Sequence, residues 1–175
     1  AYNKAAAILE HPDIIAEKAH VPVEAVRARA AETYEKIGQL YRKAKQYEDA
    51  IAAFHKAQER APERSGRVNY ALAQVSSEAG QPKQALQYLD AYLRTQPLGI
   101  EPYEMKVDLL KRTQQAAAIV PWLEATSQRD RFNNALQLLC ARELAAAGES
   151  EKAEAVYRKL ADDAPSSDVY RGLFT

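Results

Sequence analysis

Apolar residues recur along this chain at a helical spacing, and the groups they form recur in turn about every 34 residues. A small or branched residue fills one repeating position, a large apolar residue a second and proline a third. These are Ala50, Ala85, Ile119 and Ala153, then Phe54, Leu89, Leu123 and Tyr157, then Pro62, Pro97 and Pro165. The pattern predicts an all-α fold, an α/α superhelical solenoid of about four helix-turn-helix units.

Residues 31–64 carry the clearest copy of the pattern. Its positions are Tyr34, Ile37, Gly38, Tyr41, Ala50, Phe54, Ala57 and Pro62. The first four share one face of a first helix, and the next three share one face of a second. Gly38 and Ala50 have little or no side chain, so the two helices can approach closely, and Pro62 ends the unit because proline cannot continue a helix.

This arrangement resembles the tetratricopeptide repeat (TPR) family, in which an aromatic residue, Leu-Gly, Tyr, Ala, Phe and Pro occupy these positions. The resemblance predicts an array over residues 31–167, with units at 31–64, 66–99, 100–133 and 134–167. Ser65 is read as an insertion between the first two units. In the third, Lys106 replaces an apolar residue and Pro121 falls inside the second helix, which we therefore expect to begin late, near Val120.

The segments outside the array are predicted as helical extensions. Residues 1–30 read as an N-terminal extension, with short helices at 3–10 and 12–20 and a long helix that opens near Pro22. Residues 168–175 read as the start of a capping helix, with Ser167 as its cap, or as a truncated next repeat. Because the chain starts at Ala1 and stops abruptly, we expect it to be part of a larger protein.

The N-terminal extension also faintly resembles the helix-turn-helix of DNA-binding repressors. The residues that carry this resemblance are Ala16, Ala19, Val21, Val26 and Arg27. His20 stands where glycine usually makes the turn, Arg29 stands where a core residue belongs, and the surroundings are not basic. DNA reading is therefore kept as an alternative to a packing or capping role.

Composition and motifs give little support for catalysis or for a bound cofactor. Lysine and arginine together number 24, as do aspartate and glutamate, so the chain has no net positive charge. Its overall charge therefore does not favour nucleic acid or an anionic membrane as a partner. The sequence shows no phosphate loop, nucleophile elbow, zinc spacing or apolar run of about 18 residues. Cofactor, metal and catalytic residues are all predicted as none, and no compartment is indicated.

The candidates for metal binding, nucleophilic chemistry or ligand anchoring are Glu17, His20, Cys140 and Trp122. Glu17 and His20 form one Glu-x-x-His pair, where a di-iron bundle needs two pairs and further carboxylates, so both residues are assigned to the surface. Cys140 lies on an apolar stripe and is predicted to be an inert core thiol. Trp122 is assigned to packing in the degenerate third unit, with ligand anchoring as the alternative.

The resemblance implies that a peptide or helix of another protein binds along a concave wall formed by the first helix of each unit. The inward residues that we select for partner binding are Gln39, Lys43, Tyr70, Gln74, Glu104, Asp108, Leu138 and Arg142. Glu35, Gln39 and Ala71 stand at places where some family members grip the C-terminal tail of chaperones, so no such clamp is expected. The sequence thus predicts a non-catalytic scaffold whose partner is unknown.

Two other functions stay open at this point. The repeats are alternatively an accessory region of a multidomain enzyme whose catalytic domain lies outside this chain. The second alternative is a DNA-binding regulator that acts through the N-terminal helix-turn-helix-like segment.

Overall fold

A computed structural model of the chain describes residues 11–174, and this range contains α-helices, short 3-10 helices and no strand. The predicted all-α class is therefore correct for the described residues. The expected helix at 3–10 lies outside them. The chain divides into two compact units, Ala1–Thr95 and Gln96–Thr175. The repeat boundaries drawn from the sequence remain predictions.

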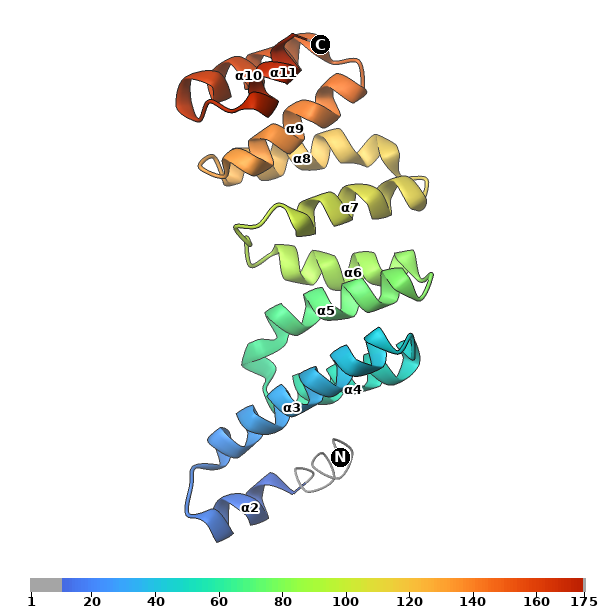
Figure 1. Cartoon of the computed structure of the whole chain (residues 1–175), viewed down its shortest axis with the longest axis vertical. Coiled ribbons are helices and arrows are strands. Elements are labelled where there is room, and N and C mark those ends of the chain that lie inside the picture. The colour runs from blue at the N-terminus through green and yellow to red at the C-terminus, as the bar shows by residue number, and fades with distance from the viewer. Residues whose placement is uncertain (1–10, 175) are drawn as a thin grey trace. The chain divides into compact units, whose positions relative to one another are not determined.

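The first compact unit is a succession of antiparallel helices joined by short turns (Figure 1). Its elements are α2 (Pro12–Ala19), α3 (Val23–Lys43), α4 (Tyr47–Arg60), the 3-10 turn η1 (Pro62–Arg64), α5 (Ser65–Glu78) and α6 (Pro82–Leu93). Helix α4 packs against both α3 and α5, and α5 packs against α6. The long helix predicted to open near Pro22 is α3, which begins directly after that proline.

The contact between α3 and α4 depends on small residues at the crossing point. A Cβ atom placed on Gly38 would lie 2.8 Å from the Phe54 ring, so no larger residue fits there without a shift. Ala50 and Ala57 are fully buried, and Tyr34 and Ile37 are nearly so. The apolar faces predicted from the sequence therefore meet as expected and form the core of this unit.

Each turn within a helix pair contains one residue in the left-handed region. Gly80 and Gly148 fill this position after α5 and α9, with φ of 74° and 83°. Lys45 and Gln114 adopt the same conformation after the two other first helices, α3 and α7, with φ of 59° and 60°. A side chain in this region costs free energy that glycine avoids.

The second compact unit contains two helix pairs and a short terminal helix. Its elements are α7 (Glu101–Arg112), the 3-10 turn η2 (Ala116–Ala118), α8 (Ile119–Arg129), α9 (Asn134–Ala146), α10 (Ser150–Asp163) and α11 (Ser167–Leu173). Helix α8 begins one residue before the predicted start near Val120. Pro121 thus lies in the first turn, where its missing N–H removes no helical hydrogen bond.

Lys106 and Trp122 form a cation–π contact between α7 and α8. The Lys106 ammonium lies 4.3 Å from the centre of the Trp122 ring, and Tyr103 stacks on that ring with centroids 6.3 Å apart. A cation over an indole ring is attracted by its electron-rich face. The lysine at an expected apolar position therefore covers a tryptophan that fills space between α7 and α8, which agrees with the packing assignment of Trp122.

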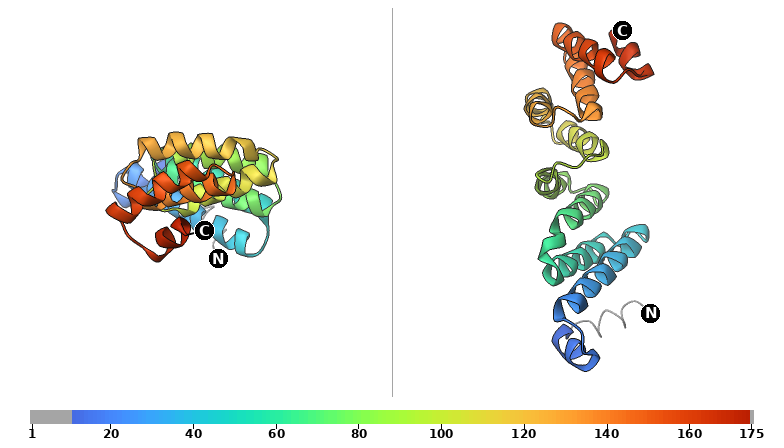
Figure 2. Two further views of the ribbon diagram at one scale, coloured as in Figure 1. Left: turned by 90° about the horizontal axis from the view of Figure 1, so that it is seen from above. Right: turned by 90° about the vertical axis from the view of Figure 1, so that its left-hand side faces the viewer.

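Helices α10 and α11 pack against α9 and close the end of the second unit (Figure 2). A Cβ atom on Gly172 would lie 2.3 Å from the Tyr157 ring, so α11 also relies on a glycine to approach its neighbour. The predicted cap of this helix is wrong by one residue. The hydroxyl of Ser166 accepts the Val169 N–H at 3.3 Å, and Ser167 is already the first helical residue.

Glu17 and His20 are both exposed, as their surface assignment predicts, but they do not share one helical face. Helix α2 ends at Ala19, and His20 lies beyond it in the left-handed conformation with φ of 55°. Because His20 is outside the helix, the spacing of three does not place the two side chains on one helical face. Within residues 11–174, no group of three or more histidine, cysteine or acidic side chains could hold a metal ion.

We expect Ala50→Leu to destabilise the first unit by roughly 1–3 kcal/mol, because the larger side chain overpacks the buried contact with α3. Urea unfolding followed by circular dichroism measures the effect. Ala52→Leu on the exposed face of the same helix is the matched control and should change stability by less than about 0.5 kcal/mol. Equal effects of the two substitutions would contradict the proposed close contact.

Lys45→Gly should stabilise the fold by up to about 1 kcal/mol, since glycine relieves the left-handed strain of the α3–α4 turn. The reverse change, Gly80→Lys, should destabilise it by a similar amount, because nothing lies within 4 Å of a Cβ atom there and only the backbone resists. Thermal unfolding of both variants measures whether each substitution raises or lowers the stability. A stabilising Gly80→Lys would show that the turn conformation carries no such cost.

Candidate functional site

An open groove lies between α3 and α5, the first helices of the two pairs in the first compact unit. Its volume is ≈ 640 Å³, and its lining includes Gln39, Lys43, Tyr70 and Gln74. These are four of the eight residues selected from the sequence for partner binding. The structure therefore brings this half of the selected set together on one surface.

The floor of the groove is apolar. Phe54 of α4 lies beneath it, Ala71 belongs to the α5 side, and Leu40 of α3 is 46% exposed. The ring of Tyr70 stacks on Tyr92 of α6 with centroids 4.9 Å apart, which fixes its position on the groove wall. The sequence reading missed Leu40, although its spacing of three from Ile37 and one from Gln39 places it at the edge of the inward face.

One end of the groove is bridged by arginines that follow α4. Arg64 donates to Glu32 at 3.0 Å and its Nε lies 3.3 Å from Glu35 Oε1, while Arg67 donates to the other oxygen of Glu35. Burial lowers the pKa of Arg64, but its hydrogen bonds and the two carboxylate charges outweigh that effect and raise the pKa. The guanidinium therefore remains charged, and both glutamates on this wall are paired.

The other end of the groove is bridged by Arg42. Its guanidinium grips both carboxylate oxygens of Glu78, with Nε at 3.0 and 3.1 Å from them. The same guanidinium donates to the Gln74 side-chain oxygen at 2.6 Å. Helices α3 and α5 are thus tied by long side chains at both ends, and the space between them stays open.

The sequence reading missed the arginines of this site. The structure places Arg64 and Arg67 against Glu32 and Glu35 of α3, and neither pair was identified from the sequence. The separation of 32 residues in both pairs is a usable signal, because it is close to one repeat period. Oppositely charged residues about one repeat apart can meet on neighbouring first helices.

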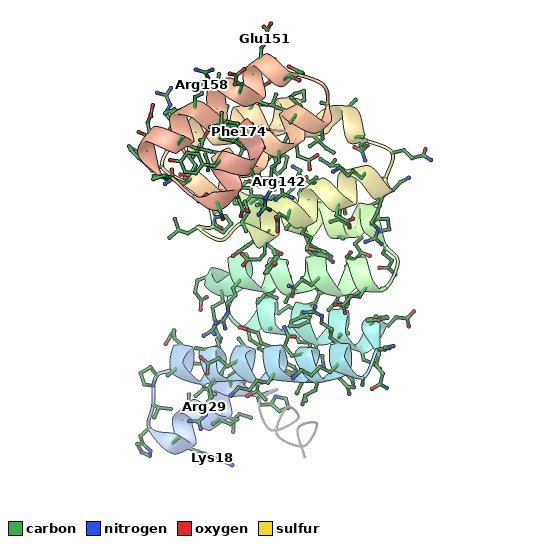
Figure 3. All side chains as sticks on the ribbon, turned by 45° about the horizontal axis from the view of Figure 1, so that its top comes forward. Lys18, Arg29, Arg142, Glu151, Arg158 and Phe174 are labelled. Atoms are coloured by element: carbon green, nitrogen blue, oxygen red, sulfur yellow. The ribbon has the colours of Figure 1, made fainter. Side chains whose placement is uncertain are left out.

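The other four selected residues lie in the second compact unit. Glu104 and Asp108 are on α7, and Leu138 and Arg142 are on α9, where Figure 3 labels Arg142. Arg142 lies 3.7 Å from Glu104, and Asp108 lies 3.5 Å from Arg112 of its own helix. Leu138 is half-buried. These residues form a mixed-charge wall whose ionic groups largely pair with one another.

Cys140 does not have the surroundings of a nucleophile. Its side chain is buried, and burial raises the pKa of the thiol, with the Glu124 charge adding to the rise against a lowering hydrogen bond from Ser127. A protonated buried thiol is a poor nucleophile. This agrees with the core assignment made from the sequence.

Within residues 11–174, no helix is both long and apolar enough to cross a membrane.

Comparisons with known proteins identify the repeat. Residues 41–105 match a family model described as a tetratricopeptide repeat. No curated protein matches the chain. Among solved structures, the chain is similar to YrrB, described as a TPR protein with an unusual peptide-binding site. The identity is 18% over 82% of this chain and 74% of that one, and the TM-score is 0.54.

Two further solved structures have the same fold. MamA is 18% identical over 82% of this chain and 78% of that one, with a TM-score of 0.57. PilF of Pseudomonas aeruginosa is 22% identical over 98% of this chain and 80% of that one, with a TM-score of 0.51. The predicted TPR solenoid class is thereby confirmed. Such folds serve in general as protein-interaction scaffolds and are generally non-catalytic, and residues 41–105 are the part of this chain that matches the tetratricopeptide-repeat model.

Proposed function

We propose that the groove between α3 and α5 binds an extended peptide segment of a partner protein, so that the chain acts as a non-catalytic interaction module. The observation that carries the proposal is the gathering of Gln39, Lys43, Tyr70 and Gln74 around an apolar floor. A volume of ≈ 640 Å³ suits a few side chains of a ligand.

The chemistry of the groove suits an extended chain. Leu40 offers exposed apolar surface to one anchoring side chain, and the amides of Gln39 and Gln74 can bond to peptide groups. Arg42 and Arg64 hold the walls at a fixed separation, which lowers the ordering cost of binding. A rigid site with an apolar anchor is the arrangement that concentrates binding energy in few residues.

Glu104, Asp108, Leu138 and Arg142 are proposed as a second contact region, on the second compact unit. The Glu104–Arg142 pair and the pairing of Asp108 with Arg112 lower the free charge of that wall, so it would contribute more to selectivity than to affinity. We propose further that the module is not a clamp for the C-terminal tail of chaperones, because Glu35, Gln39 and Ala71 occupy places that such clamps fill differently.

The two alternative functions have less support. An accessory role beside a catalytic domain would use the same groove, and assays of a product that contains both would separate the two. DNA reading is favoured only by the left-handed turn at His20 between α2 and α3. Arg27 on α3 is engaged by Asp13 at 3.3 Å, which reduces the cationic charge available to a duplex.

We expect peptides selected from a random display library on the wild-type chain to lose about tenfold or more in affinity on Leu40→Glu, because a charge replaces the exposed anchor surface. Fluorescence anisotropy with the labelled peptides measures this loss. The matched control is Leu98→Glu, which changes a residue 87% exposed outside the groove. Peptides that bind both variants as tightly as wild type would refute groove binding.

A further inference from the structure

Resting on the proposed function, we infer that the groove selects an internal acidic segment in which one large apolar side chain lies between two carboxylates. Lys36 and Lys43 are the residues that bind the carboxylates, and Leu40 contacts the apolar side chain. The interaction surface is thus the face of α3 that carries these three residues.

The first argument is the balance of charge in the groove. Four cations line it, namely Lys36, Lys43, Arg64 and Arg67, against two carboxylates, Glu32 and Glu35. The chain as a whole has a formal net charge of zero, so this excess of positive charge is local. Local charge of one sign in a cleft favours a ligand of the opposite sign.

The second argument is which of these charges are already engaged. Both glutamates pair with the two arginines, as described above. Lys36 and Lys43 are exposed, and within residues 11–174 no hydrogen bond or ion pair engages either ammonium. The positive charge that a ligand meets therefore comes from these two lysines, and the glutamates offer little repulsion.

The third argument is geometry. Lys36, Leu40 and Lys43 stand at positions i, i+4 and i+7 of α3, so they share one face with the leucine between the lysines. At 1.5 Å per residue the two lysines are separated by about 10.5 Å along the helix axis. The α3 wall therefore presents a cation, an apolar group and a second cation in order.

An extended ligand can match this order with alternating residues. Side chains on one face of an extended chain recur every second residue, and four residues span about 13 Å. A segment of the form acid–x–apolar–x–acid then places all three groups toward α3. The flexible lysine stems can cover the remaining difference of about 3 Å between the two spacings.

This ligand differs from a chain terminus. The two carboxylates belong to internal side chains, so a free C-terminal carboxylate is not required, in agreement with the proposed absence of a chaperone-tail clamp. The Glu35 carboxylate pairs with Arg64 and Arg67, so these cations offset its repulsion of an acidic ligand. Amidation of the peptide's C-terminus should leave the affinity unchanged.

The test uses peptides selected at random on the full chain, each also made with glutamine in place of its acidic residues. Three proteins are compared by fluorescence anisotropy: wild type, Lys36→Gln/Lys43→Gln, and the control Lys18→Gln/Lys83→Gln. The control removes the same charge from two exposed lysines outside the groove, on α2 and α6. All four lysines are exposed, so each variant should fold.

We expect the selected peptides to be enriched in the acid–x–apolar–x–acid order. The change to glutamine should weaken binding about fivefold or more on wild type and on the control, which is within the range for two exposed ion pairs. The same change should have almost no effect on Lys36→Gln/Lys43→Gln. The inference would be overturned if the change to glutamine still weakened binding to Lys36→Gln/Lys43→Gln. It would also be overturned if the selected peptides contained no acidic residues.

The outcomes also separate the two proposals. Peptides that lose affinity on Leu40→Glu but contain no acidic residues would leave the groove in place and remove its preference for carboxylates. Peptides that are insensitive to Leu40→Glu would remove both. A rise in dissociation constant with added salt should accompany acidic peptides on wild type and be smaller on Lys36→Gln/Lys43→Gln.

Discussion

The close contact of α3 with α4 is the interaction on which the first compact unit depends. Gly38 lets the Phe54 ring lie against the backbone of α3, and the same residue forms part of the groove floor. Helix α5 packs on α4, and long side chains bridge α3 to α5 across the groove. The groove is thus a consequence of how the core is packed, since a bulkier residue at position 38 would move its floor.

The features predicted best from the sequence are those fixed by local chemistry. At the turn between α5 and α6, Gly80 is left-handed and Pro82 opens α6, which is the asymmetry that helix ends prefer. The late start of α8 follows from Pro121 alone, because proline is tolerated only in the first turn. Ser166 and Ser167 show the limit of such reasoning, since two adjacent serines have equal capping propensity and the packing of α11 decides between them.

The sequence predicted the inward-facing residues of the candidate site but not the arginines that bridge its walls. The repeat register placed Gln39 and Tyr70 on inward faces, because an inward face is a property of each helix taken separately. The role of Arg64 depends on where η1 puts its side chain relative to Glu32, which no helical periodicity encodes. The pairing of Glu35 with Arg67 likewise depends on the structure, whereas the sequence analysis used Glu35 only as a departure from the chaperone-tail clamp.

In the groove, arginines bridge the walls and lysines stay in solvent, and this difference follows from the chemistry of the two side chains. Arg42 and Arg64 bridge the walls, as suits a planar guanidinium that can hold two acceptors at once, and Arg42 does so with both oxygens of Glu78. Lysine carries a compact, strongly hydrated charge on a flexible stem, which costs little to leave in solvent until a ligand arrives. The arginine bridges fix the shape of the groove, and the two lysines keep their charge exposed to solvent. Under our proposal, selectivity would therefore depend on side chains that play no part in folding.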